Sequence, residues 1–346
     1  MTKKQLANRF INKNPLRIVF AGELNLSMGS DRIFSYNFCN NLSKIDNVYA
    51  VLRNEYSESD VDVLILKKSF ALEKLIEIRK SNKDLLIGII NPSDKKRCIL
   101  ENVDFAIVGS VEERAYYSKY LKCFIYPLIE HIPYSLIKSY EEREENLICY
   151  HGNKQHLEML NPNIENALIK LVKEGYKFKA IYDFNSLGKI RKKFITHHVQ
   201  WKKESWLEEI SNASVGITPV SLFGGKLKEK LAKYIYLRNK DRNAFLFQYK
   251  NTINASRAFV FHQLKIPVVS EIGGSFHHIM GDQTAGHLCS SENSWYESLT
   301  FMCKNKAKAK AISEKAFMLM EKLYNPVVWC ERFIEELRDW SISYKV

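Results

Sequence analysis

Short apolar runs alternate with longer amphipathic stretches along the first part of the chain. The runs LRIVFAGEL (16–24), VDVLIL (61–66) and DLLIGII (84–90) are dominated by apolar residues, many of them β-branched. Such runs are typical of strands buried on both faces, as in a parallel sheet covered by helices. The stretch FALEKLIEIRKS (70–81) between two of them has helical spacing. The pattern predicts a doubly wound α/β domain over residues 1–138.

A polar, acidic stretch, SYEEREEN (139–146), then interrupts the pattern and predicts a linker between domains. After it the alternation restarts, with strand-like runs such as NLICYHGN (146–153) and IPVVSEIGG (266–274) separated by helical stretches. We therefore expect a second doubly wound domain over residues 147–325. Two such Rossmann-like domains would face a cleft at the carboxyl ends of their strands, where these folds bind ligands.

The composition favours a globular protein that stays in the cytoplasm. Hydrophobic residues make up 46% of the chain and charged residues 26%. No apolar run approaches the ~20 residues that span a bilayer. The first residues, MTKKQLANRFINKN, lack the apolar core of a secretory signal. The seven cysteines are scattered without a C-x-x-C pair, which argues against a disulfide framework and a zinc knuckle.

The charge indicates anionic partners. Lys and Arg number 52 against 39 Asp and Glu, a net charge of +13. Residues 189–250 hold 14 basic and five acidic residues. Such an excess suits nucleic acid, phosphorylated small molecules or an anionic membrane surface, and the alternative is solvated helix faces of a lysine-rich protein. No zinc-finger, RNP or helix-turn-helix pattern accompanies the charge, which makes nucleic acid an unlikely partner.

The first candidate anion site is the turn after the first predicted strand. Gly29 and Ser30 would let backbone N–H groups approach a phosphate at the start of a helix, and Arg32 would add charge. The turn has one glycine rather than the three of G-x-G-x-x-G, which disfavours a dinucleotide site. A plain strand-to-helix turn is the alternative.

A second candidate site lies in the second domain, where a helix is predicted to begin near Asn254. Its start would present amide, hydroxyl and guanidinium groups to one anion, and arginine binds diphosphate oxygens in pairs. A glycine-rich loop follows the next strand, and the end of the domain's first strand faces the same expected cleft. The candidate residues are Lys250, Asn254, Ser256, Arg257, Glu271, Gly273, Gly274 and Ser275, with His151, Gly152 and Lys154.

With these motifs the chain resembles the GT-B glycosyltransferases, close to the large family called glycosyl transferases group 1. The resemblance rests on YHGN-x-x-HL, ASVGITP, the helix at Asn254, IPVV with its Gly-Gly loop, and TAGHL, in the family's order over residues 147–325. It implies that the second domain binds a nucleotide-sugar and that the first binds the acceptor. It also implies that a last helix, in residues 326–346, packs back on the first domain.

The function implied by the resemblance is transfer of a sugar from a nucleotide-sugar to a hydroxyl of a glycan or lipid-linked acceptor in surface polysaccharide synthesis. The nucleotide-sugar is a co-substrate, and neither a resident cofactor nor a metal is expected. His131 is the candidate acceptor-side base, with an ordinary loop histidine as the alternative. A cytoplasmic position with loose contact to an anionic membrane surface is expected.

The chain departs from the family at one place. Many members carry two glutamates separated by seven residues before the P-V-V strand, and those positions hold Thr252 and Val260 here. Glu271 is the candidate replacement for the sugar-contacting carboxylate. An unusual donor and a loss of activity are both open.

Other features of the sequence allow different interpretations. Asp60 and Asp62 spell the D-x-D metal motif of the GT-A fold, but they precede a predicted strand, which favours a strand-start cap. The pairs at 197–198 and 277–278 lack the i, i+4 spacing of histidine ligands on a helix. The competing functions are transfer of a glycerol-phosphate or pyruvyl group on a similar fold, and a non-catalytic nucleotide- or nucleic-acid-binding protein.

Overall fold

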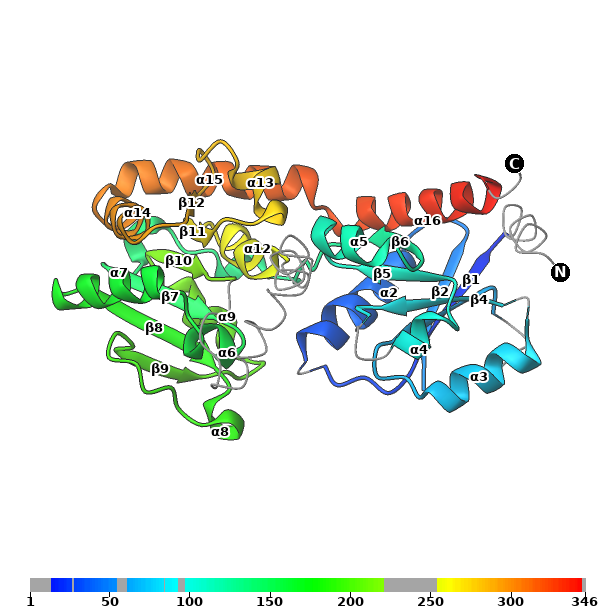
Figure 1. Cartoon of the computed structure of the whole chain (residues 1–346). Helices are drawn as coiled ribbons and strands as arrows, with labels where there is room; N and C mark the ends of the chain where they lie inside the picture. The colour runs from blue at the N-terminus through cyan, green and yellow to red at the C-terminus, as the bar shows by residue number, and fades with distance from the viewer. Residues whose placement is uncertain are drawn as a thin grey trace. The chain divides into compact units, whose positions relative to one another are not determined.

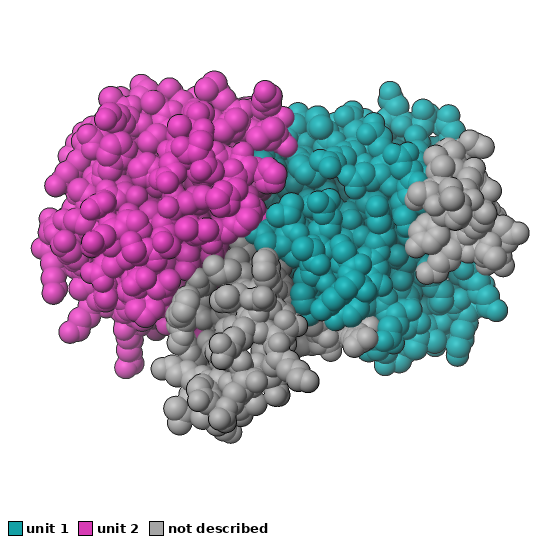
Figure 2. Space-filling view, turned by 45° about the horizontal axis from the view of Figure 1, so that its top comes forward, with its two compact units in different colours: residues 1–130, 324–346 teal, residues 131–323 magenta. Residues whose placement is uncertain are grey.

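The chain folds into two compact units, which Figure 2 shows in separate colours. Residues 1–130 together with 324–346 form the first unit, and residues 131–323 form the second. The computed structural model describes residues 14–26, 28–54, 61–83, 85–92, 97–220 and 254–343. Three residues discussed above, Asp60, Lys250 and Thr252, lie outside these ranges, as do residues 221–250 of the basic stretch 189–250.

The first unit is built on a six-stranded parallel sheet in the order β2-β1-β3-β4-β5-β6 (Figure 1). Its strands are β1 (Leu16–Ala21), β2 (Val48–Arg53), β3 (Val63–Lys67), β4 (Leu86–Ile90), β5 (Phe105–Val108) and β6 (Lys122–Ile125). Its helices are the π-helix η1 (Asp31–Asn37), α2 (Phe38–Leu42), α3 (Leu72–Ser81), α4 (Arg97–Leu100), α5 (Val111–Tyr117) and α16 (Pro326–Ser343).

Both faces of this sheet are covered. Ile18 and Phe20 of β1 belong to one core cluster, whereas Val19 and Ala21 belong to another. Since successive side chains of a strand point to opposite faces, the sheet carries a separate apolar core on each side. This arrangement explains why its strands read as continuous apolar runs, and it confirms the predicted α/β class.

The helix α16 supplies part of one of these cores. Cys330, Phe333, Ile334 and Leu337 are buried in the cluster that contains Phe38. Their i, i+3, i+4, i+7 spacing places them on one face of a helix. The last stretch of the chain therefore packs with the first unit, although the whole second unit precedes it in the sequence.

The second unit contains another six-stranded parallel sheet, in the order β12-β11-β10-β7-β8-β9. Its strands are β7 (Leu147–His151), β8 (Lys177–Tyr182), β9 (His197–Gln200), β10 (Val215–Thr218), β11 (Val268–Glu271) and β12 (His287–Cys289). Its helices are α6 (Lys154–Glu158), α7 (Pro162–Lys173), α8 (Phe184–Leu187), α9 (Trp206–Ser211), α12 (Ser256–Gln263), α13 (Gly274–Met280), α14 (Glu292–Lys304) and α15 (Lys306–Leu323), with the 3-10 turns η4 (Tyr134–Leu136) and η5 (Tyr140–Glu142).

The acidic stretch 139–146, expected as a linker, is packed on this second unit. Arg143 is buried, and its guanidinium donates hydrogen bonds to the carbonyls of Leu264 and Lys265. The backbone N–H of Glu144 donates to the carbonyl of Asn212. The buried arginine ties this stretch to the end of α12, so it is part of the unit rather than a free connection.

Each sheet has a point at which the strand order reverses direction. In the first sheet β1 lies between β2 and β3, and in the second β7 lies between β8 and β10. In open α/β sheets of this kind, ligands bind at the carboxyl ends of the strands beside such a switch point. The switch points therefore direct attention to the residues that follow β1, β3, β7 and β10.

Candidate functional site

The switch point of the second sheet is formed by the residues after β7 and β10 and by the start of α12. Gly152, directly after β7, has a φ of +131°. A Cβ atom at this position would lie 3.0 Å from Cδ of Arg257 and 3.2 Å from the hydroxyl oxygen of Tyr150. Glycine is therefore favoured by both the backbone conformation and the space, and its backbone lies directly against the Arg257 side chain.

Arg257, in the first turn of α12, spans the two strand ends. Its Nη2 donates to the carbonyl of Pro219 after β10 at 2.7 Å, and its Nη1 donates to the Tyr150 hydroxyl at 3.3 Å. The Tyr150 hydroxyl donates in turn to the carbonyl of Asn153 at 2.7 Å. These oxygens are neutral, and within the described part of the chain no carboxylate forms an ion pair with Arg257. The guanidinium is held in place, and no carboxylate of the described residues compensates its charge.

The packing of α12 against β10 explains why this arginine reaches the switch point. A Cβ at Gly216 in β10 would lie 2.5 Å from the ring of Phe261, so the ring packs flat on this glycine. At the helix start, the side-chain oxygen of Asn254 accepts hydrogen bonds from Oγ of Ser256 at 2.7 Å and from its backbone N–H at 3.4 Å. The N-terminus of α12 is thus fixed beside Arg257, and a helix N-terminus carries partial positive charge.

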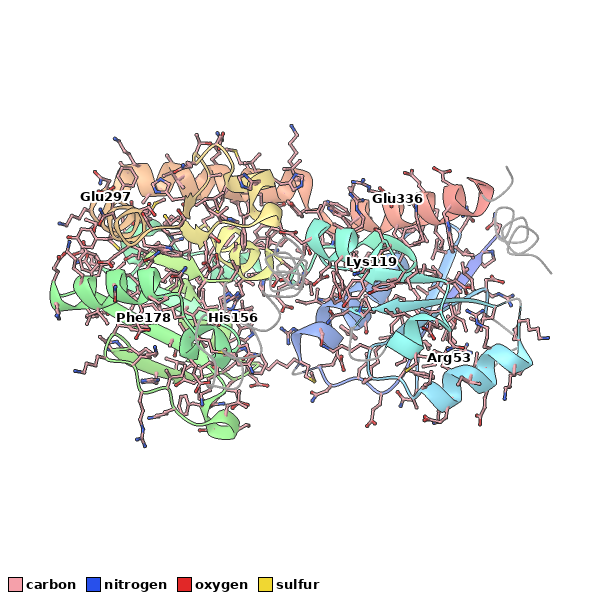
Figure 3. All side chains as sticks on the ribbon, in the orientation of Figure 1. Arg53, Lys119, His156, Phe178, Glu297 and Glu336 are labelled. Carbon is pink, nitrogen blue, oxygen red and sulfur yellow. The ribbon has the colours of Figure 1, made fainter. Side chains whose placement is uncertain are left out.

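Two histidines near Arg257 are uncharged at neutral pH. His151 is buried between the rings of Trp206 and Phe261, and its Nε2 lies 3.2 Å from the carbonyl oxygen of Arg257. Burial lowers the pKa of His151 to about 3. Burial, together with the charge of Arg257, lowers the pKa of His156 to about 2; Figure 3 labels this residue. Neither ring therefore contributes a charge to an anion site at pH 7, whereas the guanidinium of Arg257 does carry one.

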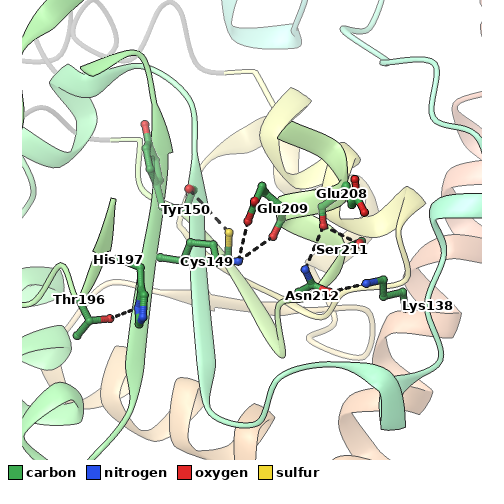
Figure 4. A network of polar contacts seen from close by, with 10 residues as sticks. Lys138, Cys149, Tyr150, Thr196, His197, Glu208, Glu209, Ser211 and Asn212 are labelled. Atoms are coloured by element: carbon green, nitrogen blue, oxygen red, sulfur yellow. Dashed lines mark hydrogen bonds and ion pairs between the residues drawn. The ribbon is translucent and has the colours of Figure 1, made fainter. Parts of the chain in front are cut away.

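The helix α9, which carries Trp206, is fastened to the sheet by a polar network (Figure 4). Nζ of the buried Lys179 in β8 donates to the carboxylate of Glu209 at 3.0 Å. The side chain of Asn212, just after α9, accepts a hydrogen bond from Lys138. These contacts hold the helix so that Trp206 packs against His151, which in turn contacts the backbone of Arg257.

The remaining candidates of the second unit have protein partners. Nζ of Lys154 pairs with Glu158 at 2.8 Å and donates to the carbonyl of Leu187. Glu271 is buried at the end of β11, where its two oxygens accept from Nδ2 of Asn161 at 3.0 Å and from the N–H of Val220 at 2.9 Å. Glu271 therefore links the end of β11 to the residues that follow β10 and to the residue that precedes α7. Gly273, Gly274 and the buried Ser275 form the start of α13.

In the first unit the cations at the switch point are paired. Arg32 binds Glu130 through Nε, at 3.0 Å from both carboxylate oxygens, and its Nη1 donates to the carbonyl of Leu26 at 3.0 Å. Asp31 accepts from the N–H of Asn25 at 3.0 Å and pairs with Lys67 of β3 at 3.4 Å. Gly29 and Ser30 lie in the helical turn before η1, and the Ser30 side chain makes no capping hydrogen bond.

The structure also gives the positions of two further candidates, His131 and Asp62. His131 is exposed and directly follows Glu130, and its role as an acceptor-side base stays a prediction. Asp62 is buried, and its carboxylate accepts from the N–H of Arg17 at 2.9 Å. This contact ties the start of β3 to β1, which agrees with the expected role at a strand start.

The structure adds Tyr150, His156, Lys67 and Glu130 to the residues around the two switch points. Tyr150 is the first residue of the motif YHGN-x-x-HL, which could have identified it, whereas the sequence carried little signal for Lys67, because a lysine at a strand end is common in any buried sheet. Glu130 pairs with a residue 98 positions away, and no local pattern reveals such a contact. His156 stands inside YHGN-x-x-HL, so this motif is the signal that could have identified it.

The described ranges contain neither a cluster of metal ligands nor a membrane-spanning helix. No group of three or more His, Cys, Asp or Glu side chains there is arranged to hold a metal ion. No helix in those ranges has the length and apolar character needed to span a membrane.

Comparison with known proteins relates the chain to others through its structure alone. No protein-family model matches it, and no curated protein matches it in sequence. Among solved structures, Alr3699/HepE of Anabaena in complex with UDP and glucose matches with a TM-score of 0.56 and 8% identity, over 94% of this chain and 100% of that one. Sucrose-phosphate synthase of Thermosynechococcus elongatus matches with a TM-score of 0.57 and 11% identity, over 95% and 100% of the two chains.

A third match is an α-glucosyltransferase in complex with UDP and DNA, with a TM-score of 0.59 and 10% identity, over 93% of this chain and 99% of that one. At identities this low, the structural matches establish a shared fold and nothing beyond it. The chain thus has the two-unit GT-B fold of nucleotide-sugar glycosyltransferases, as the resemblance implied.

Proposed function

We propose that the protein is a glycosyltransferase that uses a nucleotide-sugar and binds the donor's diphosphate at the switch point of the second sheet. The observation that carries the proposal is the guanidinium of Arg257. It lies over Gly152 beside the N-terminus of α12, and among the described residues it contacts neutral oxygens rather than a carboxylate. A positively charged group with open donor capacity at a switch point suits a diphosphate.

The same arrangement suits the chemistry of sugar transfer. When the bond between the sugar and the diphosphate breaks, negative charge develops on the leaving phosphate oxygens. Arg257 and the N-terminus of α12 would stabilise that charge without having to reorganise, because the contacts to Pro219 and Tyr150 already fix the arginine. The released sugar would be transferred to a hydroxyl of the acceptor.

The acceptor and the donor base are proposed from weaker support. HepE and the α-glucosyltransferase were solved with UDP, and TarM of S. aureus with UDP and α-GlcNAc-glycerol. UDP is therefore the first nucleotide to test. We propose a glycan or lipid-linked acceptor in surface polysaccharide synthesis, which is the role that the sequence resemblance implies.

Binding of UDP to Arg257→Ala tests the proposal. Removing a charge-assisted contact should weaken binding by about 1.5–3 kcal/mol, or roughly ten- to 150-fold in Kd, measured by isothermal titration calorimetry. Arg257→Lys should recover only part of the loss, because an ammonium lacks the paired donors of the guanidinium.

Arg332→Ala is the matched control, because Arg332 is an exposed arginine of α16 that pairs with Glu336 four residues away. Its Kd for UDP should equal that of the parent protein. An unchanged Kd in Arg257→Ala would remove this residue from the donor site. Failure of UDP, GDP, CDP and ADP all to bind the parent protein would contradict the proposed function.

A further inference from the structure

One edge of the second sheet carries a concentration of positive charge. Strand β9 ends the strand order, and α8 and a loop precede it (Figure 1). The segment 184–203, which includes α8, this loop and β9, contains no Asp or Glu. It contains six basic residues: Lys189, Arg191, Lys192, Lys193, Lys202 and Lys203.

Most of these cations are unpaired. Lys192 forms an ion pair with Glu165 at 2.5 Å. The other five are exposed, and no carboxylate of the described chain pairs with them; we call Lys189, Arg191, Lys193, Lys202 and Lys203 the basic edge. Some exposed lysines elsewhere on this unit have carboxylate partners, as in Lys177 with Glu144, whereas others, such as Lys173 and Lys322, have none in the described chain. The basic edge differs because five such cations lie within residues 189–203, in a segment without an acidic residue.

Protection of the sheet's edge does not account for the basic edge. Proteins often place lysines on an edge strand to prevent it from pairing with another chain. Here β9 itself, His197–Gln200, contains neither Lys nor Arg. The cations stand in the segments before and after the strand, where they would not block its backbone hydrogen-bonding groups.

An apolar side chain accompanies the charge. Leu187, the last residue of α8, is 53% exposed and lies two residues before Lys189. The aromatic rings of the segment are engaged, since Nζ of Lys189 lies 5.0 Å from the centre of the Phe184 ring and Trp201 lies 6.3 Å from Trp206. Sites for single-stranded nucleic acid typically offer open aromatic faces for base stacking, whereas cations beside an exposed leucine match a lipid headgroup region.

We propose that the basic edge and Leu187 form a docking surface for anionic phospholipid headgroups. The surface would hold the second unit at a membrane, with the lysines and the arginine in the headgroup layer and Leu187 at the boundary of the acyl chains. The inference draws on the proposed function for its purpose, since a lipid-linked acceptor would be presented at such a surface. Its geometry is independent of the donor site.

Co-sedimentation with vesicles tests the surface in the full-length protein. Binding should be strong to vesicles with about 30% phosphatidylglycerol and weak to vesicles of pure phosphatidylcholine. It should decrease as the NaCl concentration rises from about 50 to about 300 mM. Arg191→Glu with Lys193→Glu should lower the partition coefficient at least roughly tenfold, because the charge changes by four next to an anionic surface. Leu187→Asp should lower it as well.

Lys304→Glu with Lys308→Glu is the matched control, since it makes the same charge change at exposed positions of α14 and α15. This variant should bind vesicles within about twofold of the parent protein. Equal loss in both double variants would overturn the proposal, because net charge alone would then explain binding. An oligonucleotide that binds the basic edge and displaces the vesicles would overturn it in favour of nucleic acid.

The outcome is separable from that of the proposed function. UDP binding in the Arg191→Glu, Lys193→Glu variant should equal that of the parent protein, because these residues do not contact the switch point in the described structure. Vesicle binding without any nucleotide binding would leave the docking surface standing and contradict the donor site. Nucleotide binding without vesicle binding would do the reverse.

Discussion

Two glycines occupy equivalent positions in the two units but lie beside cations in different states. Gly22 follows β1 and Gly152 follows β7, both with φ above +120°. A Cβ at Gly22 would lie 3.5 Å from the side chain of Lys67, just as one at Gly152 would contact Arg257. Lys67 is paired with Asp31, whereas Arg257 has only neutral acceptors among the described residues. The second unit is therefore the better host for an anionic donor.

At this scale the sequence made Arg257 and Gly152 candidates but could not distinguish them from the candidates Arg32 and Lys154. All four stand at predicted strand ends or helix starts. The difference lies in partners such as Glu130, which is 98 residues from Arg32, and the carbonyl of Leu187, 33 residues from Lys154. Which cations are paired is a property of the tertiary structure, so residue spacing alone does not reveal it.

His262 should make the second unit sensitive to acid. It is fully buried on α12, neither ring nitrogen has a hydrogen-bond partner among the described residues, and burial lowers its pKa to about 3. The unfolded chain takes up a proton near pH 6.5 but the folded one does not, so stability is present above pH 6.5 and is lost as pH falls toward 3. Between pH 7 and 5 this histidine should cost about 2 kcal/mol of unfolding free energy.

His262→Leu should remove that loss. Hydrogen exchange of α12 peptides at pH 7 and pH 5, corrected for intrinsic rates, measures the change in opening free energy. His278→Gln, at an exposed histidine of α13, is the control and should follow the parent protein. The same pH dependence in His262→Leu as in the parent would show that this histidine is charged or solvated in the folded state.

Glu113 should act in the opposite direction in the first unit. It is buried, and burial raises its pKa to about 7, although the N–H of Gly109 donates to its carboxylate at 2.6 Å. The folded state holds the proton up to pH 7 and the unfolded state releases it near 4.5. Its stabilising contribution is thus complete below pH 4.5 and lost as pH rises through 7, by about 3 kcal/mol.

Glu113→Gln keeps an acceptor for Gly109 and cannot ionise, so the first unit should lose less stability between pH 5 and 8 than in the parent protein. Hydrogen exchange of α5 and β5 peptides measures this difference. Glu73→Gln, at an exposed position of α3, serves as the control. If Glu113→Gln and the parent protein have equal pH profiles, the carboxyl is already ionised at pH 5.

At the scale of elements, the apolar runs were the reliable signal. Strands such as β4 and β5 are buried along their whole length, and such apolar runs are typical of a sheet covered on both sides. The packing of the stretch 139–146 was not readable, because Arg143 reaches carbonyls more than 120 residues away. The polar composition of this stretch is explained by its exposed side chains, and it gave no sign that Arg143 is buried.

Helix α16 should stabilise the first unit but not the second. The ring of Phe333 lies 5.3 Å from that of Phe38 and 5.4 Å from that of Phe124. Phe333→Ala should cost about 3–5 kcal/mol, as for other buried aromatic residues. Hydrogen exchange should accelerate in the first sheet and stay unchanged in the second, and exposed Glu335→Ala should have no effect. Faster exchange in both sheets would show that the units are not independently stable.

At the scale of the whole molecule, the doubly wound pattern and the resemblance together predicted the GT-B fold, which the structure confirms. The roles of the two units remain proposals, because fold alone does not fix what a site binds. The paired glutamates of the family could not guide the site either, since Thr252 and Val260 stand at their positions. The candidate replacement, Glu271, accepts hydrogen bonds from Asn161 and Val220.

Turnover should survive removal of divalent ions. The fixed charge of Arg257 and the N-terminus of α12 would stabilise the leaving diphosphate, which is the role of the metal ion in a GT-A enzyme. EDTA should therefore change the rate of sugar transfer less than about tenfold. Asp60→Asn with Asp62→Asn should do likewise, since an amide oxygen at 62 can still accept from the N–H of Arg17. Loss of turnover in EDTA that Mn²⁺ restores would show that the reaction depends on a bound ion.

The return of α16 to the first unit has a consequence for how the protein is made. Residues 131–323 are contiguous, so the second unit has all of its sequence once the ribosome has passed it. The first unit, although begun earlier, lacks Phe333 and Leu337 until the stretch after residue 324 emerges. During that interval the apolar face around Phe38 and Phe124 stays uncovered. During synthesis, the part of the chain that is made first is therefore the part whose apolar surface stays exposed for longest.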